Sequence, residues 1–204
     1  MSILLDGLSL GAIYALIALG YTMVYGIAKL LNFAHGDIIM VGAYAILCML
    51  NLCGNVYVAL VAAVVICTVM GIAVEKFAYK PLRGASPLAV LITAIGVSFL
   101  LQSVAQLVFG AKSRPVSLPS FGTFTVAGVT VNASTLITLA VGAVIMAALT
   151  LFVAKTRIGR AMQAVSEDRG AAQLMGINVN AIVSVTFAIG SALAAFASLF
   201  YLWQ

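Results

Sequence analysis

Long uncharged stretches alternate with short polar breaks along almost the whole chain. A helix needs about 20 apolar residues to cross roughly 30 Å of hydrocarbon, so uncharged stretches divided at turn-forming residues predict membrane spans. Six spans result, over residues 8–28, two within 38–74, then 88–109, 136–154 and 181–203. The polar residues 51–55 divide the stretch 38–74 and predict a helical hairpin. The pattern therefore predicts an all-α integral membrane protein, a bundle of about six transmembrane helices.

Three polar segments separate the later spans. Residues 75–83 contain four charged residues and a proline, and we expect a charged loop there; they are Glu75, Lys76, Lys80, Arg83 and Pro81. Residues 112–132 change to Ser, Thr, Pro and Gly among Val and Phe, which predicts a non-spanning loop with short strands. Residues 155–178 are too charged to span and are compatible with a helix.

The basic residues favour one orientation of the six spans. An external N-terminus places eight of them on the inner side and leaves Lys112 and Arg114 outside; the eight are Lys29, Lys76, Lys80, Arg83, Lys155, Arg157, Arg160 and Arg169. Inner loops of membrane proteins carry this excess of Lys and Arg. We therefore predict an external N-terminus, a cytoplasmic segment 155–178 and an external loop 112–134.

Composition agrees with a membrane protein and gives little support to an enzyme. Hydrophobic residues make up 64% of the chain and charged residues 7%, whereas soluble proteins carry roughly 25% charged residues. Membrane orientation explains the net charge of +5 better than a nucleic-acid partner does. The single histidine and three cysteines match no metal-ligand spacing, and no G-x-x-x-x-G-K-[ST] loop occurs. We predict no catalytic residue, metal site or cofactor in this chain.

The sequence NFAHGD interrupts the apolar pattern before the second span, through Asn32, Phe33, His35, Gly36 and Asp37. The apolar part after it is shorter than about 20 residues, so we expect the helix to begin near Phe33 and to carry polar residues into the membrane. Two interpretations fit. These residues line the inner gate or pathway in a broken helix, or Asn32 or Asp37 caps the helix in a cytoplasmic turn. We favour the cap.

Ser98, Gln102 and Gln106 recur every four residues in the fourth predicted span. This spacing places a polar stripe on one helical face. The stripe suits hydrogen bonds to a passing zwitterion and equally suits hydrogen bonds to a neighbouring helix. Both interpretations stay open.

The segment 155–178 reads KTRIGRAMQAVSEDRGAAQLMGIN. Ala171 and Ala172 place small residues on one helical turn, and Gly176 suits the end of that helix. Glu167 and Asp168 lie near the helix start, where the helix dipole favours negative charge. A partner protein could approach this backbone closely; the alternative is an amphipathic segment on anionic headgroups.

This segment resembles the cytoplasmic coupling loop of ABC importer permeases, whose motif is E-A-A-x-x-x-G, with Gly170 in place of the Glu. Four other segments resemble the permease of the high-affinity branched-chain amino acid system, in matching order. They are LDGLSLGAIYALIALGYTMVYGI from Leu5, LNFAHGDIIMVGAYA from Leu31, VEKFAYKPLR from Val74 and LITAIGVSFLLQS from Leu91. Urea and short-chain amide permeases are similar in the same segments.

The resemblance implies one transmembrane permease domain over residues 1–204 in a bacterial plasma (inner) membrane. The family continues with further hydrophobic segments, so we expect the domain to be incomplete at its C-terminus. Implied partners are a second permease subunit, two ATP-binding cassette subunits that hold ATP and Mg²⁺, and a periplasmic or extracellular solute-binding protein. The implied solutes are leucine, isoleucine and valine. Implied ATPase-coupling residues are Arg157, Gly159, Arg160, Glu167, Asp168, Ala171, Ala172 and Gly176.

Two other functions compete with this one. The first is a urea or short-chain amide ABC permease, and the second is an ATP-independent secondary transporter or channel. The second would need ion-coupling acidic residues or a filter within its spans. All five acidic residues are expected at span ends or in loops, which favours a pathway powered from outside the chain; they are Asp6, Asp37, Glu75, Glu167 and Asp168.

Overall fold

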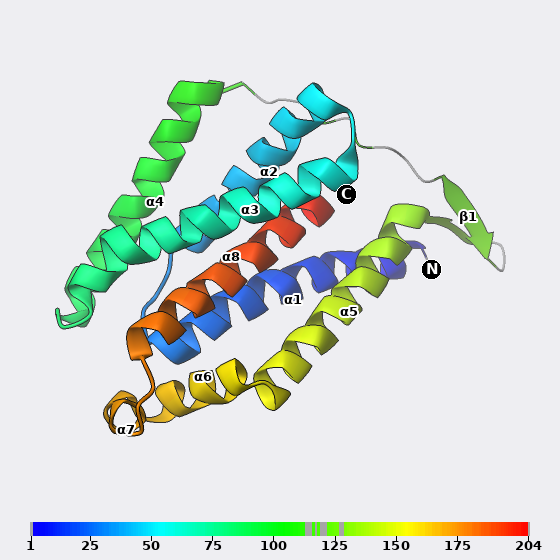
Figure 1. The fold of residues 1–204 in the computed structure, drawn as a ribbon. Helices are drawn as coiled ribbons and strands as arrows, with labels where there is room; N and C mark the ends of the chain where they lie inside the picture. Colours follow the sequence, from blue (N-terminus) through cyan, green and yellow to red (C-terminus); the bar gives the residue numbers. More distant parts are fainter. Residues whose placement is uncertain (1, 113–115, 117, 119–121, 127–128, 204) are drawn as a thin grey trace.

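The structure is a computed structural model that describes residues 2–112, 116, 118, 122–126 and 129–203. In this part of the chain, six apolar helices are long enough to cross a membrane (Figure 1). They are α1 (Ser2–Ala28), α2 (Ala34–Cys53), α3 (Val56–Val74), α4 (Pro87–Phe109), α5 (Ala133–Lys155) and α8 (Val179–Trp203). The predicted all-α membrane bundle is confirmed.

Shorter elements connect these helices. A π-helix, η1 (Glu75–Tyr79), and a 3₁₀ helix, η2 (Lys80–Leu82), continue α3, while α6 (Arg157–Glu167) and α7 (Arg169–Leu174) lie between α5 and α8. Strands β1 (Thr123–Val126) and β2 (Val129–Asn132) pair antiparallel, with Thr123 opposite Asn132. The short strands expected within 112–132 are confirmed, but Arg114 and much of the predicted loop 112–134 lie outside the described residues.

The break between α2 and α3 follows from two residues. Gly54 adopts a left-handed backbone conformation, with φ 64°, and ends α2. Asn55 then caps α3, because its Oδ1 accepts hydrogen bonds from the backbone N of Tyr57 at 2.9 Å and of Val58 at 3.4 Å. The helical hairpin predicted at residues 51–55 is confirmed.

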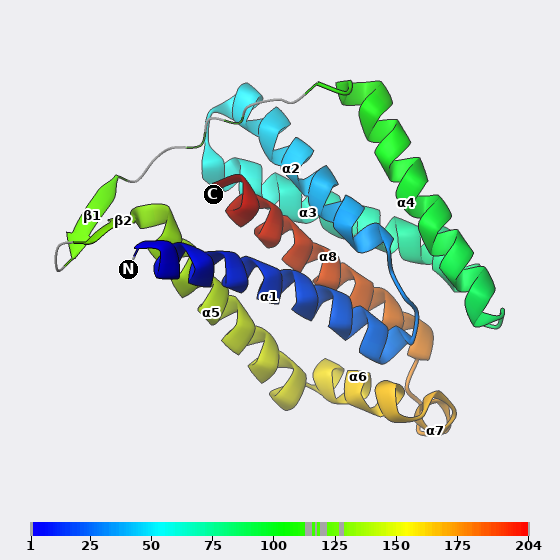
Figure 2. The same cartoon turned by 180° about the vertical axis from the view of Figure 1, so that it is seen from behind.

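Helix α8 is the most enclosed of the six spans. In its apolar stretch 61% of the residues are buried inside the protein, against 11% for α5. Figures 1 and 2 show it between α1 and α3, and it also contacts α2. Small residues permit this packing. A Cβ added at Gly190 would lie 3.2 Å from the Gly20 carbonyl oxygen of α1, and one at Gly71 of α3 would overlap the Ser191 side chain.

The charged loop predicted over residues 75–83 is wrong. The chain stays helical there through η1 and η2, and Glu75 is only 1% exposed. A buried carboxylate is tolerated where it is paired and hydrogen-bonded, and Arg83 and Ser184 provide both interactions. Asp37 and Glu75 lie at span ends, as expected, since Asp37 is in the first turn of α2 and Glu75 directly follows α3. Both residues are nevertheless buried in the protein.

Candidate functional site

Polar side chains gather where α7 meets the ends of the long helices, which we call the α7 end of the bundle. The C-terminal ends of α1, α3 and α5 and the N-terminal ends of α2, α4 and α8 lie there (Figure 2). At this end Arg83 forms an ion pair with Glu75 and donates a second hydrogen bond to the side chain of Asn180. The Ser184 hydroxyl donates to the other Glu75 oxygen at 2.8 Å. These bonds join the extension of α3 to the start of α8.

Tyr79 of the π-helix joins the same extension to the start of α2. Its hydroxyl donates to Asn32 Oδ1 at 3.0 Å, with the Leu31 carbonyl oxygen at 3.4 Å. Its ring is fully buried and lies 5.4 Å from the ring of Phe187 in α8, centroid to centroid. A π-helical turn inserts one extra residue and so redirects the side chains that follow it. Here both Glu75 and Tyr79 contact α8, and Tyr79 also bonds the segment before α2.

Helix α2 begins at Ala34, which confirms the predicted start near Phe33. The favoured cap by Asn32 or Asp37 is wrong, because Phe33 occupies the cap position and no side chain caps the helix. His35 N donates to the backbone oxygen of Asn32 at 3.2 Å instead. The Asn32 and Asp37 side chains are buried, and buried polar groups take the partners that neighbouring helices offer, so they bind Tyr79 and Gln102.

His35 lies between α2 and α1. Its ring meets the Tyr21 ring edge-on at 6.3 Å, and a Cβ added at Gly20 would lie 3.0 Å from the imidazole. The residue is 3% exposed, and Nε2 has no hydrogen-bond partner among the described residues. Phe33 and Gly36 of the same motif are exposed. The NFAHGD segment thus has two faces. Asn32 and His35 are buried against the α3 extension and α1, whereas Phe33 and Gly36 face outward.

The polar stripe of α4 contacts α2 through one of its three residues. Gln102 Nε2 donates to Asp37 Oδ1 at 2.9 Å and to Ser98 Oγ at 3.2 Å, so Gln102 makes an interhelical hydrogen bond. Asp37 Oδ2 is buried and has no partner among the described residues. Gln106, about one helical turn beyond Gln102, is exposed.

Helices α6 and α7 form the segment predicted to couple the chain to an ATPase. The Thr156 hydroxyl accepts from Gly159 N at 2.9 Å and caps α6, while Asp168 Oδ1 accepts from Gly170 N at 2.7 Å and caps α7. Gly176, with φ 81°, follows the last turn of α7, and Ile177 N donates to the Ala172 oxygen at 3.0 Å. The helix end predicted at Gly176 is confirmed.

The predicted coupling residues do not all face outward. Gly159 and Ala172 are buried against the bundle, and the exposed or partly exposed ones are Arg157, Arg160, Glu167, Asp168, Ala171 and Gly176. The apolar side of α6, with Met162 and Val165, is also buried in the protein. That burial disfavours the alternative in which this side lies on lipid headgroups, because the apolar side chains are already covered.

Leu174 and Met175 are functional candidates that the sequence reasoning missed. They lie at the end of α7 with 91% and 82% of their surfaces exposed. An apolar pair directly before a helix-ending glycine, within an otherwise charged segment, was the available signal. Exposed large apolar side chains outside a membrane span are typical of contacts with another protein.

Arg169 connects α7 to α1. Its guanidinium Nη2 donates to the Ala28 carbonyl oxygen and lies 3.5 Å from the Ile27 oxygen. These carbonyls belong to the last turn of α1, where no intrahelical donor remains and a cation is favourable. Burial lowers the pKa of Arg169, and the nearby charge of Arg83 lowers it further. In the sequence Arg169 contributed only to the orientation argument.

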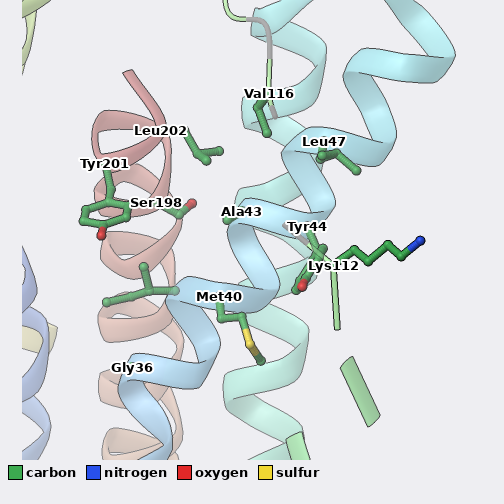
Figure 3. A pocket seen from close by; sticks show the side chains of 11 residues that line it. Gly36, Met40, Ala43, Tyr44, Leu47, Lys112, Val116, Ser198, Tyr201 and Leu202 are labelled. Carbon is green, nitrogen blue, oxygen red and sulfur yellow. The ribbon is translucent and has the colours of Figure 1, made fainter. Parts of the chain in front are cut away.

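A groove of about 450 Å³ runs between α2 and α8 (Figure 3). It begins at Gly36 and passes Met40 and Tyr44 on α2 and Ser198 and Tyr201 on α8. Its walls are mainly apolar, with the hydroxyls of two tyrosines and a serine as polar groups, and the Lys112 side chain extends away from it (Figure 3). Of the predicted pathway residues only Gly36 lines this groove. No group of three or more His, Cys, Asp or Glu is placed to hold a metal ion within the described residues.

Comparison with known proteins gives a consistent result. The family described as the permease component of the branched-chain amino acid transport system matches residues 3–204. The high-affinity branched-chain amino acid transport system permease protein BraD of Pseudomonas aeruginosa is 40% identical over 186 residues, which cover 84% of this chain and 61% of that protein. The corresponding protein LivH of Escherichia coli K12 is 43% identical over 187 residues, covering 83% and 60%. LivH of Salmonella typhimurium is 41% identical over 187 residues, covering 83% and 60%.

The chain thus spans about three fifths of the length of the curated relatives it matches. No solved structure matches it. The six apolar helices and the bacterial relatives make it a multi-pass protein of the bacterial plasma membrane. Because the family match extends over residues 3–204, the chain belongs to the family of branched-chain amino acid transport system permease components.

Proposed function

We propose that the chain is a membrane-spanning permease subunit of an ATP-driven importer for leucine, isoleucine and valine. A second permease subunit completes the pathway, two ATP-binding cassette subunits hold ATP and Mg²⁺, and an external solute-binding protein delivers the solute. Residues 1–204 contribute one transmembrane domain, with the N-terminus and residues 112–134 outside and residues 155–178 in the cytoplasm. The chain itself carries no P-loop sequence and acts as a transport subunit, without enzymatic activity of its own.

The observation that carries this proposal is the construction of α7. Its outer end presents Leu174 and Met175 to a partner, while Arg169 on the same short helix is bonded to the last carbonyls of α1. A partner that binds the exposed pair and moves would displace α1 through Arg169. Such a connection suits a chain whose movements are driven by ATP hydrolysis in another subunit.

The groove between α2 and α8 supports an apolar amino acid as the solute. Apolar walls with a few hydroxyls favour the side chains of leucine, isoleucine and valine over urea, which offers almost no apolar surface. The names of the relatives agree with this preference. In the proposed pathway the solute leaves the groove beside Gly36, where the NFAHGD segment forms the inner gate.

The test replaces Leu174 and Met175 together by alanine in the importer reconstituted with its copurifying subunits. We expect ATP-dependent leucine uptake to fall at least tenfold and less ATPase subunit to copurify. The reason is that apolar anchor residues at protein interfaces commonly contribute about 1–2 kcal/mol each. The control is Leu107→Ala, which removes an 85% exposed leucine from α4. Full uptake by the Leu174/Met175 variant would contradict the coupling role, and uptake without ATP would support the ATP-independent alternative.

A second test uses Gly176, which the sequence singled out. Gly176→Leu forces a side chain into a left-handed backbone conformation and adds bulk beside the exposed pair. We expect ATP hydrolysis to continue while uptake falls, so that the ratio of ATP consumed to solute imported rises. An unchanged ratio at unchanged uptake would argue against this site as the coupling surface.

A further inference from the structure

A cavity of about 410 Å³ lies at the α7 end between α1 and α4. The last turn of α1 and the connection to α2 form one side, η2 and the first turns of α4 form the other, and Arg169 of α7 closes the base. Three of its lining residues are basic: Lys29, Arg83 and Arg169. No Asp or Glu lines it. The proposed solute pathway does not use this cavity, and the proposed coupling route shares only Arg169 with it.

The three cations are only partly compensated. Arg83 is paired with Glu75, but its Nε is buried and has no hydrogen-bond partner among the described residues. Arg169 is bonded to uncharged backbone carbonyls, and Arg83 is close enough to lower its pKa. Lys29 is exposed and forms no ion pair with a described residue. Two positive charges therefore remain without a counterion, which favours an anionic ligand.

The backbone at Lys29 points to a use for its side chain. Lys29 has φ 50°, the left-handed region, and no other described non-glycine residue has a positive φ. Glycine adopts this conformation readily, whereas in other residues the Cβ crowds the following carbonyl oxygen. A lysine at such a position is strained locally, and residues held in this region cluster at functional sites.

The surroundings of the cavity are apolar. Tyr25, Leu82 and Leu91 line it, and Tyr25 is 48% exposed. Leu88, in the first turn of α4 beside the lining residue Pro87, is 63% exposed. A ligand that fits must therefore combine a negative group for the cations with apolar chains that lie along α1 and α4. A free phosphate, or an acidic side chain of a partner protein, would satisfy the cations but leave the apolar wall uncovered.

We propose that this cavity binds an anionic phospholipid, with its phosphate between Lys29, Arg83 and Arg169 and its acyl chains along the exposed faces of α1 and α4. Basic cavities between transmembrane helices at the membrane surface bind such headgroups. The lipid would hold Arg169 in place at the end of α1. The inference does not depend on the identity of the transported solute or on ATP coupling.

The experiment measures thermal unfolding of the delipidated protein, with its copurifying subunits, in a neutral detergent. Phosphatidylglycerol, phosphatidylcholine and inorganic phosphate are titrated in separate series, and native mass spectrometry counts the lipid retained. We expect phosphatidylglycerol to raise the unfolding temperature with saturation, and the other two to leave it nearly unchanged. Equal shifts with both lipids, or a saturable shift with phosphate alone, would overturn the assignment of an anionic lipid.

Two lysine variants localise the effect. Lys29→Gln should weaken phosphatidylglycerol binding about fivefold, since a basic residue near anionic lipid contributes about 1 kcal/mol. The control Lys80→Gln removes an equal charge outside the cavity and should change phosphatidylglycerol binding less than twofold. Lys29→Gly should weaken binding similarly without lowering the unfolding temperature of the lipid-free protein, because glycine relieves the left-handed conformation. Equal weakening by Lys29→Gln and Lys80→Gln would overturn the site. So would tight phosphatidylglycerol binding by Lys29→Gly.

Discussion

Replacing Glu75 by alanine tests the junction at the α7 end of the bundle. The variant removes the only carboxylate paired with Arg83 among the described residues. It also removes the acceptor of the Ser184 hydroxyl. The Arg83 guanidinium would then keep only its hydrogen bond to Asn180, and the contact between the α3 extension and α8 would lose its central group.

The magnitude follows from the burial of the two partners. Removing one member of a buried ion pair costs about 3–5 kcal/mol, mainly because the other charge stays uncompensated. The Glu75 side chain is 2% exposed but that of Arg83 is 15% exposed, so water still reaches the guanidinium and we expect about 3 kcal/mol. For chains of this length each kcal/mol changes the unfolding temperature by about 2–4 °C, which predicts a decrease of about 6–12 °C.

The assay is thermal unfolding of the purified protein in detergent, followed by tryptophan fluorescence or by precipitation. Glu75→Gln keeps an acceptor and should lose about half as much, and the double variant Glu75→Ala/Arg83→Ala should be more stable than Glu75→Ala alone, since no buried charge remains. An unfolding temperature of Glu75→Ala equal to that of the unmodified protein would refute the reasoning. Strict additivity of the two single variants would refute it as well.

Three further variants test individual contacts by the same unfolding assay. Gly71→Ala places a methyl group against a side chain of α8 and should lower the free energy of unfolding by about 1–3 kcal/mol. Its control, Gly96→Ala on an open face of α4, should raise that free energy by about 0.5–1 kcal/mol. Equal effects of the two variants would disprove the close approach of α3 and α8. Gln102→Leu should lower stability by about 1 kcal/mol because Asp37 loses its donor, and normal uptake kinetics in that variant would leave only a packing role for Gln102. Asn55→Ala should cost about 1 kcal/mol by removing the cap of α3, and an unchanged unfolding temperature would show that this cap is unimportant.

The number and positions of the spanning helices could be predicted because lipid imposes a simple rule. Apolar length decides which segments cross, and turn chemistry at Gly54 and Asn55 decides where the second crossing ends. The end of α7 at Gly176 was predictable for the same reason, since a local backbone requirement selects the residue.

The interactions at the α7 end could not be predicted, because they join residues far apart in the chain. In the sequence Glu75 and Arg83 resemble an ordinary polar loop. Their partners lie about a hundred positions further along the chain, where Ser184 bonds Glu75 and Asn180 bonds Arg83. The Asp37 side chain similarly suited a local cap, but Gln102 offered it a buried hydrogen bond. Local sequence identifies the polar groups, whereas tertiary packing selects their partners.

The close fit around α8 restricts how the bundle can deform. Ser191 and Ser198 of α8 face Gly71 of α3 and Gly42 of α2, where an added methyl group would collide with them, and Gly190 touches the backbone of α1. Turning α8 about its long axis would drive bulkier neighbours into these places on three sides. Tilting of α1, α2, α3 and α8 together as one unit leaves those contacts intact, and it is the motion that this packing permits.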